Sequence, residues 1–97
     1  MANAFETEAR LAILGELNKQ SDGRLNEILL DRTLSAQGYS RSRDWLRTQL
    51  RKLEELGAVT ITTTPDDLLI AGLTREGLEH FERRSNIDGI ATRPRWS

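Results

Sequence analysis

Residues 40–57, SRSRDWLRTQLRKLEELG, decide the fold because they predict one helix with two different faces. Leucines recur in this stretch at spacings of four and three residues, so they share one side of a helix that must be buried. These leucines are Leu46, Leu50 and Leu53, with Leu56 at the margin. Ser42 is the best N-cap candidate, because its hydroxyl can accept a hydrogen bond from an unpaired backbone N–H of the first turn. Gly57 closes the helix.

Positive charge gathers on the opposite side of the same helix and on its lead-in. Residues 41–52 hold five Arg or Lys residues and one Asp, whereas the rest of the chain carries nine positive and 14 negative residues. A nearly neutral protein with such a local concentration presents a surface suited to an anionic polymer. The alternative is a solvated helix face balanced by Glu54 and Glu55. The residues expected to contact nucleic acid are Arg41, Ser42, Arg43, Arg47, Thr48 and Arg51.

Length and composition indicate one domain. The 97 residues suit a single hydrophobic core, which we expect within residues 1–84, followed by a C-terminal tail at 85–97. The chain has no cysteine, which excludes disulfides and thiolate metal sites and fits a reducing compartment. No apolar run approaches the roughly 18 residues that a membrane-spanning helix needs, so we expect a soluble, cytoplasmic protein. A net charge of −1 argues against a protein that coats nucleic acid indiscriminately.

Upstream, residues 4–20 predict a first helix with two apolar stripes. One stripe is formed by Leu11, Leu14 and Leu17, and the other by Phe5, Ala9, Ala12 and Ile13. An amphipathic surface helix usually shows one stripe, so the second stripe requires a second partner. That partner is either another copy of the chain, which would make the second stripe a homodimer interface, or the chain's own final helix or tail.

A second helix is expected at residues 27–37, capped by Asn26 and ended by Gly38, with a very short strand at Arg24-Leu25 before it. Its buried face is expected to comprise Ile28, Leu29, Leu30 and Leu34. Few residues separate this helix from the next, and one of them is a glycine. Such a short connection is typical of a helix-turn-helix, in which the second helix can enter a groove of DNA.

After Gly57 the pattern becomes alternating. Residues 58–62 predict a half-buried strand, residues 63–67 a turn and residues 68–73 a returning strand. Thr74 is expected to cap a last helix at residues 75–84 that presents Leu78 and Phe81 inward. The tail has too little periodicity for an element of its own, although Ile90 and Trp96 are candidates for packing.

This order of elements resembles a winged helix-turn-helix domain. The resemblance is carried by LRTQLRKLEELGAV at residues 46–59, by the strand pair and by LTREGL at residues 73–78. In MarR-like and ArsR-like regulators, a similar Leu-x-x-Leu-x-x-x-Gly-x-Val pattern ends the recognition helix and opens the wing, and Leu-Thr-x-x-Gly follows. The resemblance implies a mainly α (α+β) fold, with three helices, a two-stranded β-hairpin wing and a C-terminal helix.

The chain is also similar to small winged-helix proteins of Mu-like phages and prophages. The matching residues are Arg10-Leu11 through Leu14, Arg24-Leu25-Asn26-Glu27, Ser42-Arg43-Asp44, Gly89-Ile90 and Arg93-Pro94. This similarity implies a phage-borne DNA-binding or regulatory protein. Two features depart from the wider pattern. The hairpin tip at residues 63–67 has no Arg or Lys to reach a groove or a phosphate, and ArsR-like metal sensing is unsupported because His80 stands alone without cysteines.

No constellation for catalysis is present in the sequence. A metal site needs three or four convergent ligands, and a catalytic histidine needs a nucleophile and an orienting group. We therefore expect His80 at the surface or at the boundary of the core, and no enzymatic activity, metal or cofactor. Tyr39 is expected to pack between the two helices of the helix-turn-helix, whereas Trp45 is either a flank contact or an exposed platform.

The sequence is compatible with two functions. One is a DNA-binding winged-helix protein, dimeric and acting as a phage or prophage transcriptional regulator. The other is a winged-helix module for protein-protein interaction or phage assembly, in which the arginines would pair with a partner's carboxylates and Trp45 would be an anchor.

Overall fold

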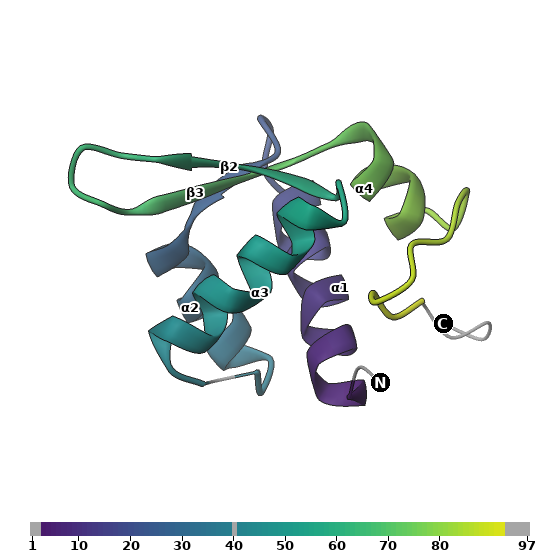
Figure 1. Ribbon diagram of the computed structural model, residues 1–97, viewed down its shortest axis with the longest axis horizontal. Helices are drawn as coiled ribbons and strands as arrows, with labels where there is room; N and C mark the ends of the chain where they lie inside the picture. The colour runs from purple at the N-terminus through teal and green to yellow at the C-terminus, as the bar shows by residue number, and fades with distance from the viewer. Residues whose placement is uncertain (1–2, 40, 93–97) are drawn as a thin grey trace.

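The computed structural model describes residues 3–39 and 41–92 of the chain. Within these ranges, four helices and three strands follow one another in the order expected from the sequence (Figure 1). The helices are α1 (Ala4–Asn18), α2 (Glu27–Ala36), α3 (Arg43–Glu55) and α4 (Arg75–Phe81). The strands are β1 (Arg24–Asn26), β2 (Val59–Thr63) and β3 (Leu69–Leu73). The α+β class and the helix-turn-helix followed by a hairpin are confirmed.

The sheet has one strand more than the expected hairpin. β1 pairs antiparallel with β3, which pairs antiparallel with β2, so the strand order is β1-β3-β2. Leu25 of β1 lies opposite Ala71 of β3 in this register, and both side chains are buried. The very short strand expected at Arg24-Leu25 therefore exists, and it ties the start of α2 to the sheet.

α1 crosses the middle of the molecule, where it contacts α2, α3, α4 and β3 (Figure 1). Its buried side is one broad face, because Ala9, Ile13, Leu14 and Leu17 all have 0% of their surface exposed. The expectation that Ala9 and Ile13 meet a second copy is wrong for these two residues, since the chain's own core covers them. The other two residues assigned to a dimer interface are partly buried: Ala12 packs against the core, and the ring of Phe5 lies 5.4 Å from that of Tyr39.

The buried face of α2 differs from the expected one. Leu30 and Leu34 are buried as expected, but Ile28 and Leu29 are 43% and 41% exposed, and Glu27 is buried in their place. The physical reason is the helical period, because three consecutive residues of a helix fan out over about 200° and cannot all face one core. Glu27, Leu30 and Leu34 follow the spacing of three and four residues that places side chains on one face.

The helix caps agree with the sequence. A side-chain oxygen of each expected N-cap residue accepts a hydrogen bond from a backbone N–H of the first turn: Asn26 from Leu29, Ser42 from Trp45 and Thr74 from Gly77. Gly57 follows α3 with a positive φ of 80°, which a glycine adopts without strain. Leu46, Leu50 and Leu53 of α3 are at most 2% exposed, as expected. The rings of Tyr39 and Trp45 are partly buried and pack against the core.

α4 is shorter than expected, and the chain after it turns back onto α1. His80 of α4 is 1% exposed, which corrects the expectation of a surface or boundary position. The reason lies in residues that follow α4: the backbone N–H of Ile87 donates to His80 Nδ1, and His80 Nε2 donates to the carbonyl of Ala91, both at 2.9 Å. Ile90 is buried, also as expected, whereas Trp96 lies outside the described residues. The division into a domain at 1–84 and a tail at 85–97 stays a prediction.

None of the helices described by the structure is long and apolar enough to cross a membrane. In residues 3–39 and 41–92, no three His, Cys, Asp or Glu side chains come together in a way that could hold a metal ion.

Candidate nucleic-acid interface

The six residues expected to contact nucleic acid all lie on α3 or on the segment that leads into it. The structure places Arg41, Ser42, Arg43, Thr48 and Arg51 at the exposed surface, and Arg47 is half-buried. They share this surface because the leucines of α3 occupy the opposite side and anchor the helix to α1 and β2. The amphipathic pattern of one helix is therefore enough to bring these residues together.

The structure adds a buried acidic residue directly behind this surface. Glu27, the first residue of α2, is 1% exposed, and its carboxylate lies beside two of the six residues. Oε1 accepts from Arg43 Nε at 3.0 Å and from Arg47 Nε at 2.8 Å. Oε2 accepts from Arg47 Nη2 at 2.8 Å and from the backbone N–H of Leu69 at 2.6 Å. One carboxylate thus joins α2, α3 and β3.

These donors stabilise the ionised form of the carboxylate. The hydrogen bond from Arg47, with those from Leu69 and Arg43, outweighs the opposing effect of burial and lowers the pKa of Glu27 from 4.5 to about 2. The same contact raises the pKa of the Arg47 guanidinium. Glu27 is therefore an anion at any physiological pH, and it neutralises part of the positive charge of α3.

Arg47 is largely occupied by internal contacts. Besides its two bonds to Glu27, it donates from Nη2 to the backbone carbonyl of Asp67 at 2.6 Å, and its Nη1 lies 3.9 Å from the Asp67 carboxylate. Asp67 belongs to the turn between β2 and β3, so Arg47 bridges α2 and α3 to the tip of the hairpin. A direct contact of Arg47 with DNA would need some of these bonds to open.

Arg43 keeps more of its donors available. Only its Nε binds Glu27, its side chain is 56% exposed, and the terminal nitrogens have no partner among the described residues. Bound in this way, the guanidinium is held by one edge while its other edge can bind a phosphate or a base.

The remaining members of the surface make weak or local contacts. Arg51 pairs with Glu54 one turn later at 3.1 Å, and both side chains are about half exposed, so this pair adds little stability. Thr48 donates its hydroxyl to the carbonyl of Asp44, which leaves its oxygen as an acceptor. The guanidinium of Arg41 lies 4.1 Å from the ring centre of Phe5, in a cation–π contact.

The tip of the hairpin is acidic. Asp66 and Asp67 are exposed there, and a hollow of about 300 Å³ between the tip and α3 is lined by Arg43, Asp44 and Arg47 together with these two residues. The tip has no Arg or Lys, as its sequence requires, and its acidic residues lie against the arginines of α3.

Sequence reasoning missed Glu27, although a signal was present. Glu27 occupies the same helical face as Leu30 and Leu34, and an acidic residue on the apolar face of a helix is rarely buried unless it is paired. The pairing itself joins residues that are 16, 20 and 42 positions apart, a relation that no local pattern reveals.

Proteins of known structure with a similar fold include Sco3205 and RosR. Sco3205 is a MarR family transcriptional regulator from Streptomyces coelicolor solved in complex with DNA, which has 28% sequence identity to this chain and a TM-score of 0.61. The match covers 78% of this chain and 45% of Sco3205, so the chain spans less than half the length of that regulator. The other is RosR from H. salinarum, with 20% identity, a TM-score of 0.63 and coverage of 84% of this chain and 69% of RosR.

No protein-family model matches the sequence, and no curated protein sequence matches it either. The structural likeness, together with the helix-turn-helix, the hairpin and the C-terminal helix, shows that the chain folds as a winged helix similar to that of the MarR family regulator Sco3205.

Proposed function

We propose that this chain binds double-stranded DNA through α3 and acts as a transcriptional regulator without enzymatic activity. The observation that carries the proposal is the exposed, arginine-rich side of α3 in a winged-helix fold, where a second helix of a helix-turn-helix can enter the major groove. The likeness to Sco3205, which was solved with DNA, supports it.

The roles we propose follow from how exposed each residue is and from the contacts that it makes within the chain. Arg41, Arg43 and Arg51 bind DNA phosphates and supply most of the affinity. Ser42 and Thr48 lie near base edges in the major groove and contribute to recognition of the DNA sequence. Arg47 acts mainly by holding the hairpin tip against α3, because most of its donors are bound to Glu27 and Asp67.

The experiment compares two double variants by fluorescence anisotropy with duplex DNA over a series of salt concentrations. Arg43→Ala with Arg51→Ala removes two cations from α3, and we expect binding about tenfold weaker or more and a salt slope lower by about two units. Arg75→Ala with Arg84→Ala is the matched control, because it removes two exposed, carboxylate-paired arginines outside α3. Equal weakening by both variants, or by neither, would contradict the assignment to α3.

We also propose that the chain forms a homodimer and that it is encoded by a phage or prophage. Dimerisation would place two copies of α3 on two half-sites, but the burial of Ala9 and Ile13 leaves only Phe5 and Ala12 of the expected interface.

A second candidate function is a winged-helix module that binds a protein. Ile28 and Leu29 favour it, because these two large apolar side chains are exposed next to each other at the start of α2. The acidic hairpin tip favours it as well, since it would repel a phosphate backbone. The absence of saturable DNA binding at micromolar protein and low salt would favour this function over the first.

A further inference from the structure

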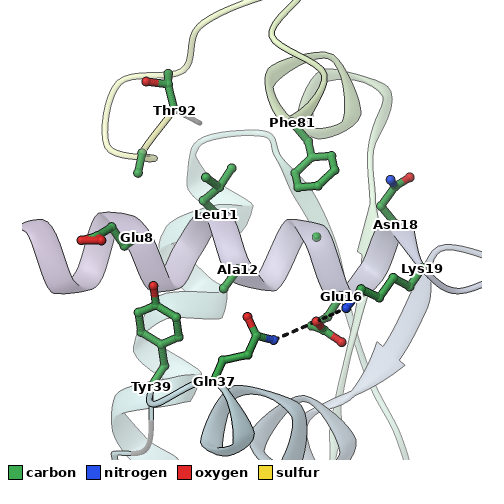
Figure 2. A pocket seen from close by; sticks show the side chains of 12 residues that line it. Glu8, Leu11, Ala12, Glu16, Asn18, Lys19, Gln37, Tyr39, Phe81 and Thr92 are labelled. Atoms are coloured by element: carbon green, nitrogen blue, oxygen red, sulfur yellow. Dashed lines mark hydrogen bonds and ion pairs between the residues drawn. The ribbon is translucent and has the colours of Figure 1, made fainter. Parts of the chain in front are cut away.

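A groove runs along the side of α1 that faces away from α3 (Figure 2). Its volume is about 590 Å³, within the range of sites that hold a ligand or a peptide side chain. Its lining comes from α1, from Gln37 and Tyr39 just after α2, from Phe81 of α4 and from the last described residues, Ala91 and Thr92.

The floor of the groove is apolar and its rim is polar. Leu11, Ala12 and Phe81 supply the apolar surface, and Gly15 widens the floor because a Cβ at this position would lie only 3.2 Å from Phe81 Cε1. Figure 2 shows Leu11 and Phe81 on one side of α1, with Tyr39 on the other.

Two glutamates of the rim differ in their partners. Glu16 binds Lys19 at 2.9 Å and accepts from the side-chain amide of Gln37 at 2.8 Å. Glu8 is exposed, and its carboxylate has no hydrogen bond or ion pair among the described residues. An unpaired carboxylate at the mouth of an apolar groove suits an occupant that combines an aromatic ring with a positive charge.

The chain itself supplies such a segment immediately after the groove. Thr92 lines the groove at the end where Glu8 lies (Figure 2), and the sequence continues with RPRWS at residues 93–97. Trp96 is four residues beyond Thr92, a reach of about 13 Å for an extended chain. Glu8 and Gly15 are about 10 Å apart along the helix axis, so Trp96 can reach the whole apolar floor.

We propose that this groove is the docking site of the chain's own residues 93–97. The indole of Trp96 packs against Leu11 and Phe81, and an arginine of the segment pairs with Glu8. Docking within one chain is favoured over docking between chains, because the tether holds the segment beside the groove at a high effective concentration.

Trp96 can report on its own surroundings if the other tryptophan is removed. In a Trp45→Phe variant we expect blue-shifted emission from Trp96 and a severalfold lower acrylamide quenching constant than for the same protein unfolded in guanidinium. Adding Ala12→Asp, which places a charge on the groove floor, is expected to shift the emission to the red and to raise the quenching constant. Ala4→Asp is the matched control, because Ala4 is exposed on the same helix outside the groove lining, and it is expected to leave both unchanged.

The charge pair is tested by Glu8→Lys in the same background, which is expected to raise the quenching constant of Trp96 in part, with circular dichroism as the check on folding. If Trp45→Phe does not fold, the emission of Trp96 is obtained by subtracting the spectrum of Trp96→Phe from that of the wild type, with and without Ala12→Asp. Emission from Trp96 as in the unfolded chain would overturn the proposal. Protection that grows with protein concentration, together with a dimer in sedimentation, would overturn it in favour of a second copy. Both outcomes are independent of DNA binding, so they leave the proposed function to its own test.

Discussion

Glu27 shows how one side chain links the fold to the proposed binding surface. A buried carboxylate is costly unless it is paired and hydrogen-bonded, and here two arginines and one backbone N–H satisfy its two oxygens. The pairs orient Arg43 and Arg47 and hold β3 beside α2. Removing the charge of Glu27 therefore affects both stability and the position of the arginines.

Glu27→Gln is expected to lower the free energy of unfolding by about 2–3 kcal/mol at pH 7, because it leaves two arginines without their anion. The pKa of Glu27 is lowered to about 2 in the folded state, so its stabilisation is complete above about pH 4.5 and is lost as the pH falls toward 2. The difference between wild type and variant should therefore shrink over this window. Urea unfolding at pH 7 and pH 3 measures it.

The control for this prediction is Asp31→Asn, which removes an exposed carboxylate on the same helix that has no ion pair among the described residues. We expect it to change the free energy of unfolding little at either pH. A difference between wild type and Glu27→Gln that stays constant from pH 7 to pH 3 would contradict the assigned ion pairs.

At the scale of elements, the junction of α3, β2 and α4 depends on two residues of the LTREGL stretch. Thr74 caps α4 and donates its hydroxyl to the carbonyl of Gly57 at 2.7 Å, while its backbone N–H donates to the carbonyl of Ala58. Gly77 then packs directly against the backbone of Ala58, since a Cβ there would overlap the Ala58 carbonyl oxygen. The Leu-Thr-x-x-Gly spacing of residues 73–77 thus has a steric cause in this chain.

Gly77→Ala is expected to destabilise the protein by about 2–3 kcal/mol, because the clash involves backbone atoms that cannot move aside without displacing α4. This loss opposes the gain of up to about 1 kcal/mol that alanine brings to a helix interior. Thermal unfolding measures the net effect. Glu76→Ala, at the exposed neighbouring position, serves as the reference, and a Gly77→Ala protein at least as stable as this reference would refute the close packing.

At the scale of the whole molecule, the residues after α4 close one side of the core. Ile90 is buried, and the N–H of Ala91 donates to the carbonyl of Thr7 on α1. Arg10 reaches from α1 to the carbonyl of Gly89 and to the side chain of buried Gln49 on α3, each at 2.8 Å. The residues after α4 therefore help to cover the broad apolar side of α1. The sequence left open whether these residues or a second copy of the chain would cover it.

His80 of α4 binds the same stretch of chain through the backbone of Ile87 and Ala91, so His80→Leu is expected to release residues 87–91. The substitution leaves the N–H of Ile87 and the carbonyl of Ala91 without their partner, at a cost of about 2 kcal/mol or more. Hydrogen exchange should become faster at the amides of Ile87 and Ala91, with a smaller change in α3. Ser85→Ala, at an exposed site, is the control, and unchanged exchange at both amides in His80→Leu would show that His80 does not hold the segment.

The sequence by itself determined the order of the elements, the N-caps at Asn26, Ser42 and Thr74, and the arginine-bearing side of α3. These features depend on residues within about one helical turn or one strand of each other, so local periodicity and cap chemistry are sufficient. Tertiary structure alone decided that Glu27 binds the arginines, that His80 is buried and that Ala9 and Ile13 belong to the core. Each of these depends on elements far apart in the chain, whose approach is set by packing and not by any neighbouring residue.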